Sequence, residues 1–235
     1  MASFLEQTNL RRITLVCQDW GGLIGLRLVA RDPDRFARVV TANTGLPTGQ
    51  AKPSAAFLRW RRFSQKSPEL DIPFIIGSAC VNPLSDEAAR GYAAPFPTPA
   101  YQAGAKVFPL LVPISPEYPS AAENRQAWEV LKQFKRPWLN GTRRRAPPGA
   151  RASADAGLRR VAPAGAAAFS DSDPITRGAD KVFEALVPGT RGQKHTVIRS
   201  AGHFLQEDAG VELAHVVHRF IVDNPFAVLA AGSKL

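Results

Sequence analysis

A carboxylate on a tight strand-to-helix turn constrains this chain more than any other feature of its sequence. Residues 13–17 form a short, apolar, β-branched run that is typical of a buried parallel strand, and residues 21–29 take up helical spacing. Asp19 therefore lies on the bend between them, and Cys17 and Gly21 are the small neighbours that such a turn requires. The N–H groups at the start of the helix would stabilise a negative charge there.

The residue type at this turn predicts a kind of chemistry. Serine or cysteine usually occupies it, whereas an ionised carboxylate can attack a saturated carbon and form an alkyl ester that water later cleaves. The alternative interpretation is that Asp19 only caps the following helix. The flanking glycines favour a nucleophile.

Length and composition predict one globular domain. The chain has 235 residues, 45% of them hydrophobic, which is enough for a full core. No secretory signal, membrane span or metal-ligand spacing is visible. We expect an intracellular protein with no membrane partner, no metal and no cofactor, in which Cys17 and Cys80 are reduced core thiols.

Half of the net charge of +10 lies in residues 140–167, which contain six arginines and one acid. This segment consists almost wholly of Ala, Arg, Gly and Pro and lacks apolar periodicity, so it predicts a disordered insertion. An RNA-binding arm is the alternative. Because no aromatic residues that could stack on bases are interleaved with the arginines, we expect no nucleic-acid partner.

The last three residues, Ser233, Lys234 and Leu235, match a peroxisomal import address. They predict binding to a peroxisomal import receptor and a peroxisomal location. Without that address we would expect the protein to be cytoplasmic.

The remaining pattern predicts an α/β fold with a mostly parallel sheet, flanked by helices. Residues 39–42 form a second strand, and residues 47–119 are helices broken by prolines, which predicts a helical cap inserted after that strand. Residues 1–46 and 120–235 then form the core. Within it we expect helices at 121–131, 179–186 and 211–222, a strand split between 138–139 and 168–170, and a strand at 196–198.

Two further polar positions follow predicted strands, where open α/β sheets place their catalytic groups. Asp173, before Pro174, is the better candidate acid, although Asp171 is the alternative. His203 follows the last strand. The order nucleophile, acid, histidine is that of a hydrolase triad. The other histidines are expected to be structural, and they are His195, His215 and His218.

These motifs resemble those of haloalkane dehalogenases of the α/β-hydrolase superfamily. The resemblance rests on Cys-Gln-Asp-Trp-Gly-Gly at 17–22, Asp-Pro at 173–174 and Ala-Gly-His-Phe at 201–204, and covers most of the chain outside 140–167. It implies that Asp19 displaces halide from a small halogenated hydrocarbon. His203, paired with Asp173, would then activate water to hydrolyse the ester.

The resemblance also implies where the halide and substrate lie. Trp20 follows the nucleophile, and Trp60, from the cap motif Phe-Leu-Arg-Trp, matches the second halide donor, although simple lid packing would also explain it. Asn43 occupies the place where another dehalogenase branch carries its acid, which favours Asp173. The implied apolar pocket residues are Phe57, Phe108 and Phe204.

The chain departs from this family in two respects. The family has opening strands and an oxyanion loop upstream of the first residue here, so we expect an exposed edge on the strand at 13–17. The insertion at 140–167 also interrupts the strand leading to Asp173. Its composition suggests a retained intron and a missing upstream exon in the gene model.

Two rival functions stay open at this point. An epoxide hydrolase has a similar triad and uses cap tyrosines, for which Tyr92, Tyr101 and Tyr118 are available. A non-catalytic remnant, or a binding protein, is the rival from another class. The pair Phe57 and Trp60, together with Gln18, favours halide chemistry.

Overall fold

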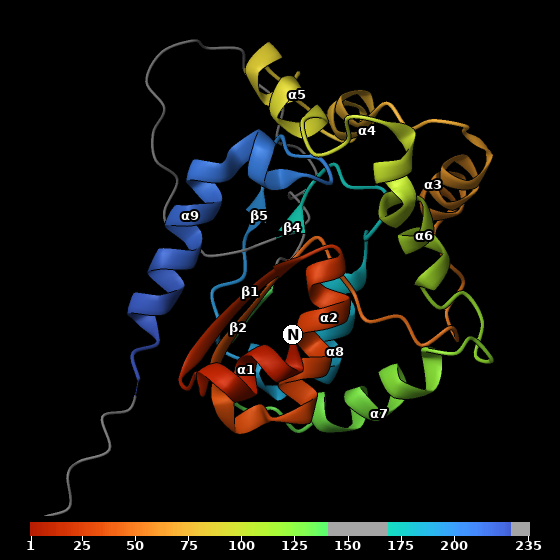
Figure 1. Ribbon diagram of the computed structural model, residues 1–235. Coiled ribbons are helices and arrows are strands. Elements are labelled where there is room, and N and C mark those ends of the chain that lie inside the picture. The colour runs from red at the N-terminus through yellow and green to blue at the C-terminus, as the bar shows by residue number, and fades with distance from the viewer. Residues whose placement is uncertain (141–168, 227–235) are drawn as a thin grey trace, which may run out of the picture.

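The chain folds around parallel strands in a computed structural model, which describes residues 1–140 and 169–226 (Figure 1). β1 (Ile13–Gln18), β2 (Phe36–Ala42) and β3 (Trp138–Asn140) lie in the order β1-β2-β3, and β4 (Phe169–Ser170) pairs in parallel with β5 (Val197–Ile198). The helix α2 (Trp20–Arg31) connects β1 to β2, and Pro33 opens the short 3-10 turn η1 (Pro33–Arg35) after it. The expected βαβ unit is confirmed.

Two apolar clusters cover the two faces of the sheet. Val39 and Trp138 pack with α2, α7 (Ala121–Leu131) and α8 (Ala179–Leu186) on one face. Their neighbours Val40 and Leu139 pack with α9 (Leu205–Asp223) on the other. Successive residues of a strand point to opposite faces, so this alternation produces three layers, with helices on both sides of the sheet. Figure 1 shows α9 on one side and α2 and α8 on the other.

The helices between β2 and α7 gather at one end of the sheet (Figure 1). They are α3 (Ala55–Lys66), α4 (Ile72–Ser78), α5 (Asp86–Ala93), the 3-10 turn η2 (Pro99–Gln102) and α6 (Ala103–Leu111). Ser54, Asp71 and Ser85 precede α3, α4 and α5, and each side chain accepts a backbone N–H of the first turn. Side-chain caps therefore begin these short helices, as expected for Ser and Asp at this position.

The expected split strand is found as two strands with different partners. β3 pairs with residues 39–41 of β2, whereas β4 pairs with β5. The Ser170 N–H of β4 donates to the Asn43 side chain, just beyond the end of β2 (2.9 Å). β4 thus continues along the side of β2 where β3 stops. Asn140, the first residue of the expected insertion at 140–167, is a fully buried residue of β3.

Three other details differ from expectation. α9 begins at Leu205 rather than at 211, because a separate first turn joins it across non-helical backbone at Ala209. α1 (Ala2–Thr8) and the 3-10 turn η3 (Pro188–Thr190) were not predicted. Cys17 is buried, but Cys80 is only partly buried and is not a core thiol.

Several predictions fall wholly or partly outside the described residues. Residues 141–168 and the import address Ser233, Lys234 and Leu235 lie there, so the disorder of that segment, its lack of a nucleic-acid partner and peroxisomal import stay predictions. Across residues 1–140 and 169–226, helices long and apolar enough to span a membrane are absent. β1 lies at one edge of its sheet, and Val16 on it is 48% exposed.

The close contact between α2 and the end of β2 yields a stability prediction. A Cβ atom at Gly22 would lie 1.8 Å from the Thr44 Oγ1, whereas one at Gly21 would lie 3.5 Å from the nearest side-chain atom. Gly22→Ala should therefore lower the free energy of unfolding by about 1–3 kcal/mol. Urea titration followed by circular dichroism measures this, with Gly21→Ala as the control. Equal stability of the two variants would contradict the packing described here.

Candidate active site

Asp19 lies at the bend between β1 and α2 with an unusual backbone conformation. Its φ of 47° and ψ of −121° are sparsely populated for a residue with a side chain. Its N–H donates to the Asn43 carbonyl (3.1 Å), and its carbonyl accepts the Thr44 hydroxyl (2.6 Å) and the Gly22 N–H (3.0 Å). These three bonds hold the strained turn. Asp19 caps α2 only in position, since its side chain makes no cap hydrogen bond.

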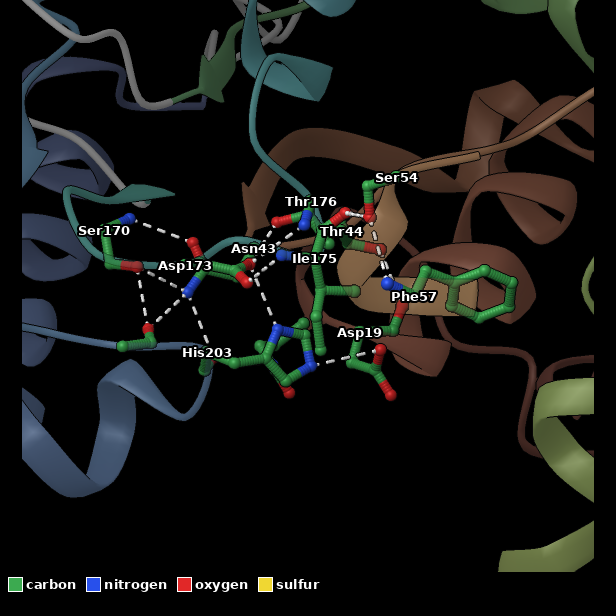
Figure 2. Close-up of polar contacts among 12 residues, drawn as sticks. Asp19, Asn43, Thr44, Ser54, Phe57, Ser170, Asp173, Ile175, Thr176 and His203 are labelled. Carbon is green, nitrogen blue, oxygen red and sulfur yellow. Dashed lines mark hydrogen bonds and ion pairs between the residues drawn. The ribbon is translucent and has the colours of Figure 1, made fainter. Parts of the chain in front are cut away.

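His203 lies between two carboxylates, and Figure 2 shows all three side chains converging. Its Nε2 lies 3.3 Å from the Asp19 Oδ1, and its Nδ1 lies 3.0 Å from the Asp173 Oδ2. The residues come from the ends of β1, β4 and β5. The structure therefore brings together the nucleophile, acid and histidine positions that the sequence motifs predicted.

The environments of the two carboxylates differ. The Asp173 side chain is 2% exposed and accepts the N–H of Ile175 (2.7 Å) and the hydroxyl of Thr176. The Asp19 side chain is 42% exposed and opens into a cavity. Asp173 is thus fixed by its own turn, while Asp19 stays free to meet a ligand.

Asp171, the alternative acid, faces away from this histidine. Its carboxylate accepts the N–H groups of Ser200 (3.2 Å) and Ala201 (3.4 Å) in the loop after β5. It therefore stabilises a turn, and geometry favours Asp173 as the partner of His203.

The pKa of His203 reflects its position between the two acids. Burial alone would lower the pKa, but hydrogen bonds and charges from Asp173 and Asp19 outweigh burial and raise it to about 9. For Asp173, burial opposes ionisation, yet its hydrogen bonds to His203 and Thr176 leave the pKa below the ordinary value. The two carboxylates thus favour the protonated form of His203, and the imidazolium favours the ionised form of Asp173.

The side chain of Asn43 ties the loop of His203 to β2 and β4. Its Nδ2 donates to the carbonyls of Gly202 (2.8 Å) and His203 (3.0 Å), and its Oδ1 accepts the Ser170 N–H (2.9 Å). The Gln18 Nε2 donates to the same His203 carbonyl (3.0 Å). Asn43, at the position where an acid was the alternative, thus connects β2, β4 and the loop of His203 by hydrogen bonds (Figure 2).

Asp19 and His203 line a cavity of about 1110 Å³ between the sheet end and the cap. Among the described residues, Trp128 and Trp138 donate their indole N–H groups to the Leu46 carbonyl and to the Thr41 hydroxyl. Trp20 and Trp60 also line the cavity, and within residues 1–140 and 169–226 no hydrogen bond occupies either N–H. Two indole donors are therefore available in this mostly apolar cavity.

The predicted pocket phenylalanines all reach this cavity. Phe57, Phe108 and Phe204 line it, and the Phe108 ring lies 4.9 Å from that of Trp20, centroid to centroid. The first turn of α3, which bears Phe57, is fastened to the loop after Asp173, because the Ser54 hydroxyl donates to the Ile175 carbonyl (3.1 Å).

The cap tyrosines are poorly placed to donate a proton to an epoxide oxygen. Tyr92 lines the cavity but donates its hydroxyl to Glu207 (2.5 Å), Tyr118 donates to the Leu110 carbonyl, and Tyr101 is 64% exposed. His195 accepts the Asn140 N–H (3.1 Å) and lies away from the triad, while His215 and His218 are exposed on α9.

Sequence reasoning missed most of the residues that position the triad. Ser54 and Thr44 have no sequence signal that separates them from ordinary polar residues, and Gln18 stands out only as part of the motif at 17–22. Thr176 could have been found, because Asp-Pro-x-Thr at 173–176 is a pattern in which the Asp side chain accepts groups two and three residues later.

Comparison with known proteins agrees with this geometry. Residues 1–209 match the family model described as the α/β hydrolase fold. A haloalkane dehalogenase from Psychrobacter cryohalolentis is 44% identical over 96% of the chain, and one from Mycolicibacterium paratuberculosis is 41% identical over 91%. The chain covers 65% and 62% of the length of these two relatives, less than two thirds of each. The predicted resemblance to haloalkane dehalogenases is confirmed.

Solved structures show the same fold. A tetrameric haloalkane dehalogenase from Paraglaciecola agarilytica superposes with a TM-score of 0.71 at 24% identity, over 90% of this chain and 61% of that one. A haloalkane dehalogenase from Agrobacterium tumefaciens has a TM-score of 0.68 at 20% identity, over 94% of this chain and 70% of that one. At these identities the likeness concerns the fold.

The flanking carboxylates make the titration of His203 testable. Asp19→Asn removes one of the two charges that raise the pKa of His203 to about 9, so this pKa should fall. Asp171→Asn is the matched control, because this carboxylate faces Ser200 and Ala201. NMR titration of the histidine rings measures both. A His203 pKa that is unchanged in Asp19→Asn, or that falls equally in the control, would contradict the geometry.

Proposed function

This chain belongs to the α/β-hydrolase fold family, and we propose that it hydrolyses haloalkanes to an alcohol and a halide ion. The observation that carries the proposal is a half-exposed carboxylate, Asp19, that lies beside a buried histidine–carboxylate pair and faces an apolar cavity with two available indole N–H donors. Similarity to haloalkane dehalogenases at 39–44% identity supports it.

In the first step an Asp19 oxygen attacks the carbon that bears the halogen. The carbon–oxygen bond of an ester forms as the carbon–halogen bond breaks, and the halide leaves with the bonding electrons. Trp20 and Trp60 donate their N–H groups to the leaving halide. Tryptophan is a donor only, so these side chains suit an anion in a mostly apolar cavity.

In the second step water hydrolyses the ester. His203 Nε2 takes a proton from a water molecule that attacks the ester carbonyl of Asp19, and the proton then passes to the departing alkoxide. Asp173 holds the ring by its Nδ1 and balances the charge that forms. The alcohol leaves, and the second proton of the attacking water passes from the Asp19 carboxyl to His203 Nε2, so Asp19 is a carboxylate again.

The electrostatics link the two steps. With Asp19 ionised, two carboxylates favour a protonated His203 and its pKa is about 9. Alkylation converts Asp19 to a neutral ester and removes one of these charges, so the pKa of His203 falls. The neutral base needed for hydrolysis is therefore favoured only after the ester has formed.

The epoxide hydrolase alternative is less well supported. It requires a tyrosine hydroxyl free to protonate the epoxide oxygen, whereas the hydroxyls of Tyr92 and Tyr118 are already donated to protein acceptors. The non-catalytic alternative is less well supported, because His203 lies within hydrogen-bonding distance of both Asp19 and Asp173.

Turnover of two substrates separates these functions. The chain should release bromide from 1-bromobutane and form no diol from styrene oxide. Ion chromatography and gas chromatography measure the products. Diol formation without bromide release would establish the epoxide hydrolase, and a cooperatively folded chain that turns over neither substrate would establish the non-catalytic alternative.

The donor role of Trp60 gives a separate prediction. Trp60→Phe keeps an apolar ring but removes the N–H, and should lower kcat/KM for 1-bromobutane about 10- to 100-fold. Phe63→Leu is the control, because Phe63 packs near Trp60 (ring centroids 6.2 Å apart) and offers no donor. Unchanged halide release in Trp60→Phe would show that Trp60 only packs in the cap.

A further inference from the structure

The first turn of α9 contacts both the cap and the loop that bears His203. Asp208 lies at the end of this turn, before the break in the helix at Ala209. Its carboxylate accepts the N–H groups of Val81 (2.9 Å) and Asn82 (2.7 Å), which follow α4 of the cap. The same carboxylate accepts the Gly202 N–H (2.7 Å), next to the catalytic histidine.

The cap main chain also touches the histidine directly. The His203 N–H donates to the Ala79 carbonyl (2.7 Å), which ends α4. A Cβ atom at Gly202 would lie 2.2 Å from that same carbonyl oxygen, so the two backbones are packed as closely as a glycine permits. Residues 79–82 of the cap therefore lie against residues 202–203 of the core, and Asp208 spans both.

The Asp208 carboxylate is held by amide groups. Across residues 1–140 and 169–226 it has no basic partner within ion-pair distance. Partial burial would raise its pKa, but the hydrogen bonds from Gly202, Asn82 and Val81 leave it below the ordinary value. A carboxylate has acceptor sites for several donors at once, whereas the amide of an asparagine has one acceptor oxygen.

We propose that Asp208 is a positioning residue, which fastens the cap segment 79–82 to the loop of His203 and so holds the imidazole between Asp19 and Asp173. The proposal rests on the proposed function for its kinetic consequence. His203 acts in ester hydrolysis, whereas Asp19 alone attacks the substrate carbon. Loss of the Asp208 contacts should therefore slow the second step and spare the first.

Asp208→Asn tests this, because it keeps the size of the side chain and removes the charge and one acceptor oxygen. Hydrolysis of the ester should slow about 10- to 100-fold. Rapid-quench kinetics with 1-bromobutane should then show a burst of about one bromide per active site, followed by slow turnover. Glu207→Gln is the matched control, because it removes a charge from the same helical turn and keeps an acceptor for Tyr92. We expect no new burst in this variant.

A second measurement is independent of turnover. The Nδ1 proton of His203, bonded to Asp173, should give a low-field NMR signal in the unmodified chain and in Glu207→Gln. It should broaden or disappear in Asp208→Asn while the thermal melt remains cooperative. If bromide burst, hydrolysis rate and this signal are all unchanged in Asp208→Asn, the proposal is wrong. If both chemical steps slow equally and the signal persists, the role is structural only.

A variant that does not fold and an unmodified chain that releases no bromide call for different measurements. If Asp208→Asn does not fold, Asn82→Ala removes one side-chain donor to Asp208 (3.1 Å) at an exposed position, and should slow hydrolysis selectively by a smaller factor. If the unmodified chain releases no bromide, the proposed function fails, and the NMR signal alone then decides whether Asp208 positions His203.

Discussion

The backbone at the end of β2 determines where both reacting groups lie. The Asn43 carbonyl and the Thr44 hydroxyl hold the main chain of Asp19 in a conformation with φ of 47° that would otherwise relax. The Asn43 side chain meanwhile binds the carbonyls of Gly202 and His203. Two adjacent residues therefore fix Asp19 and His203, the proposed nucleophile and base, relative to each other, although these lie far apart in the sequence.

The difference in exposure between the two acids then divides their roles. Asp173 is buried, and Thr176 and Ile175 occupy its oxygens, so it can only orient and stabilise the imidazole. Asp19 has few competing partners and faces the cavity, so it can react. Placing two carboxylates in unlike surroundings is a general way to give them different tasks. In the proposed mechanism it also makes the protonation of His203 depend on whether Asp19 carries an alkyl group.

The parts of the site that sequence reasoning predicted share one property. Asp19, Asp173 and His203 each follow a short apolar strand, and a parallel sheet brings the carboxyl ends of its strands to one edge. Local pattern thus placed three distant residues together. Trp60 and Phe57 were found only through their resemblance to a family motif, because helical periodicity in the cap does not indicate which face meets the sheet.

The positioning residues escaped prediction for a physical reason. Asn43, Ser54 and Asp208 act through hydrogen bonds to backbone groups, which any sequence supplies at any position. Their partners depend on how the cap packs on the core, and that packing has no local signal. The early start of α9 has the same origin, since its first turn is held by the cap and is separated from the rest of the helix at Ala209.

The central claim is that Asp19 forms a covalent alkyl ester that His203 hydrolyses. Intact-protein and peptide mass spectrometry of His203→Gln, incubated with 1-bromobutane, tests this most directly. The account predicts the added mass of one butyl group on the peptide that contains Asp19, and no such mass in Asp19→Asn. Stoichiometric bromide release without a modified Asp19, or a butyl group on another residue, would contradict it.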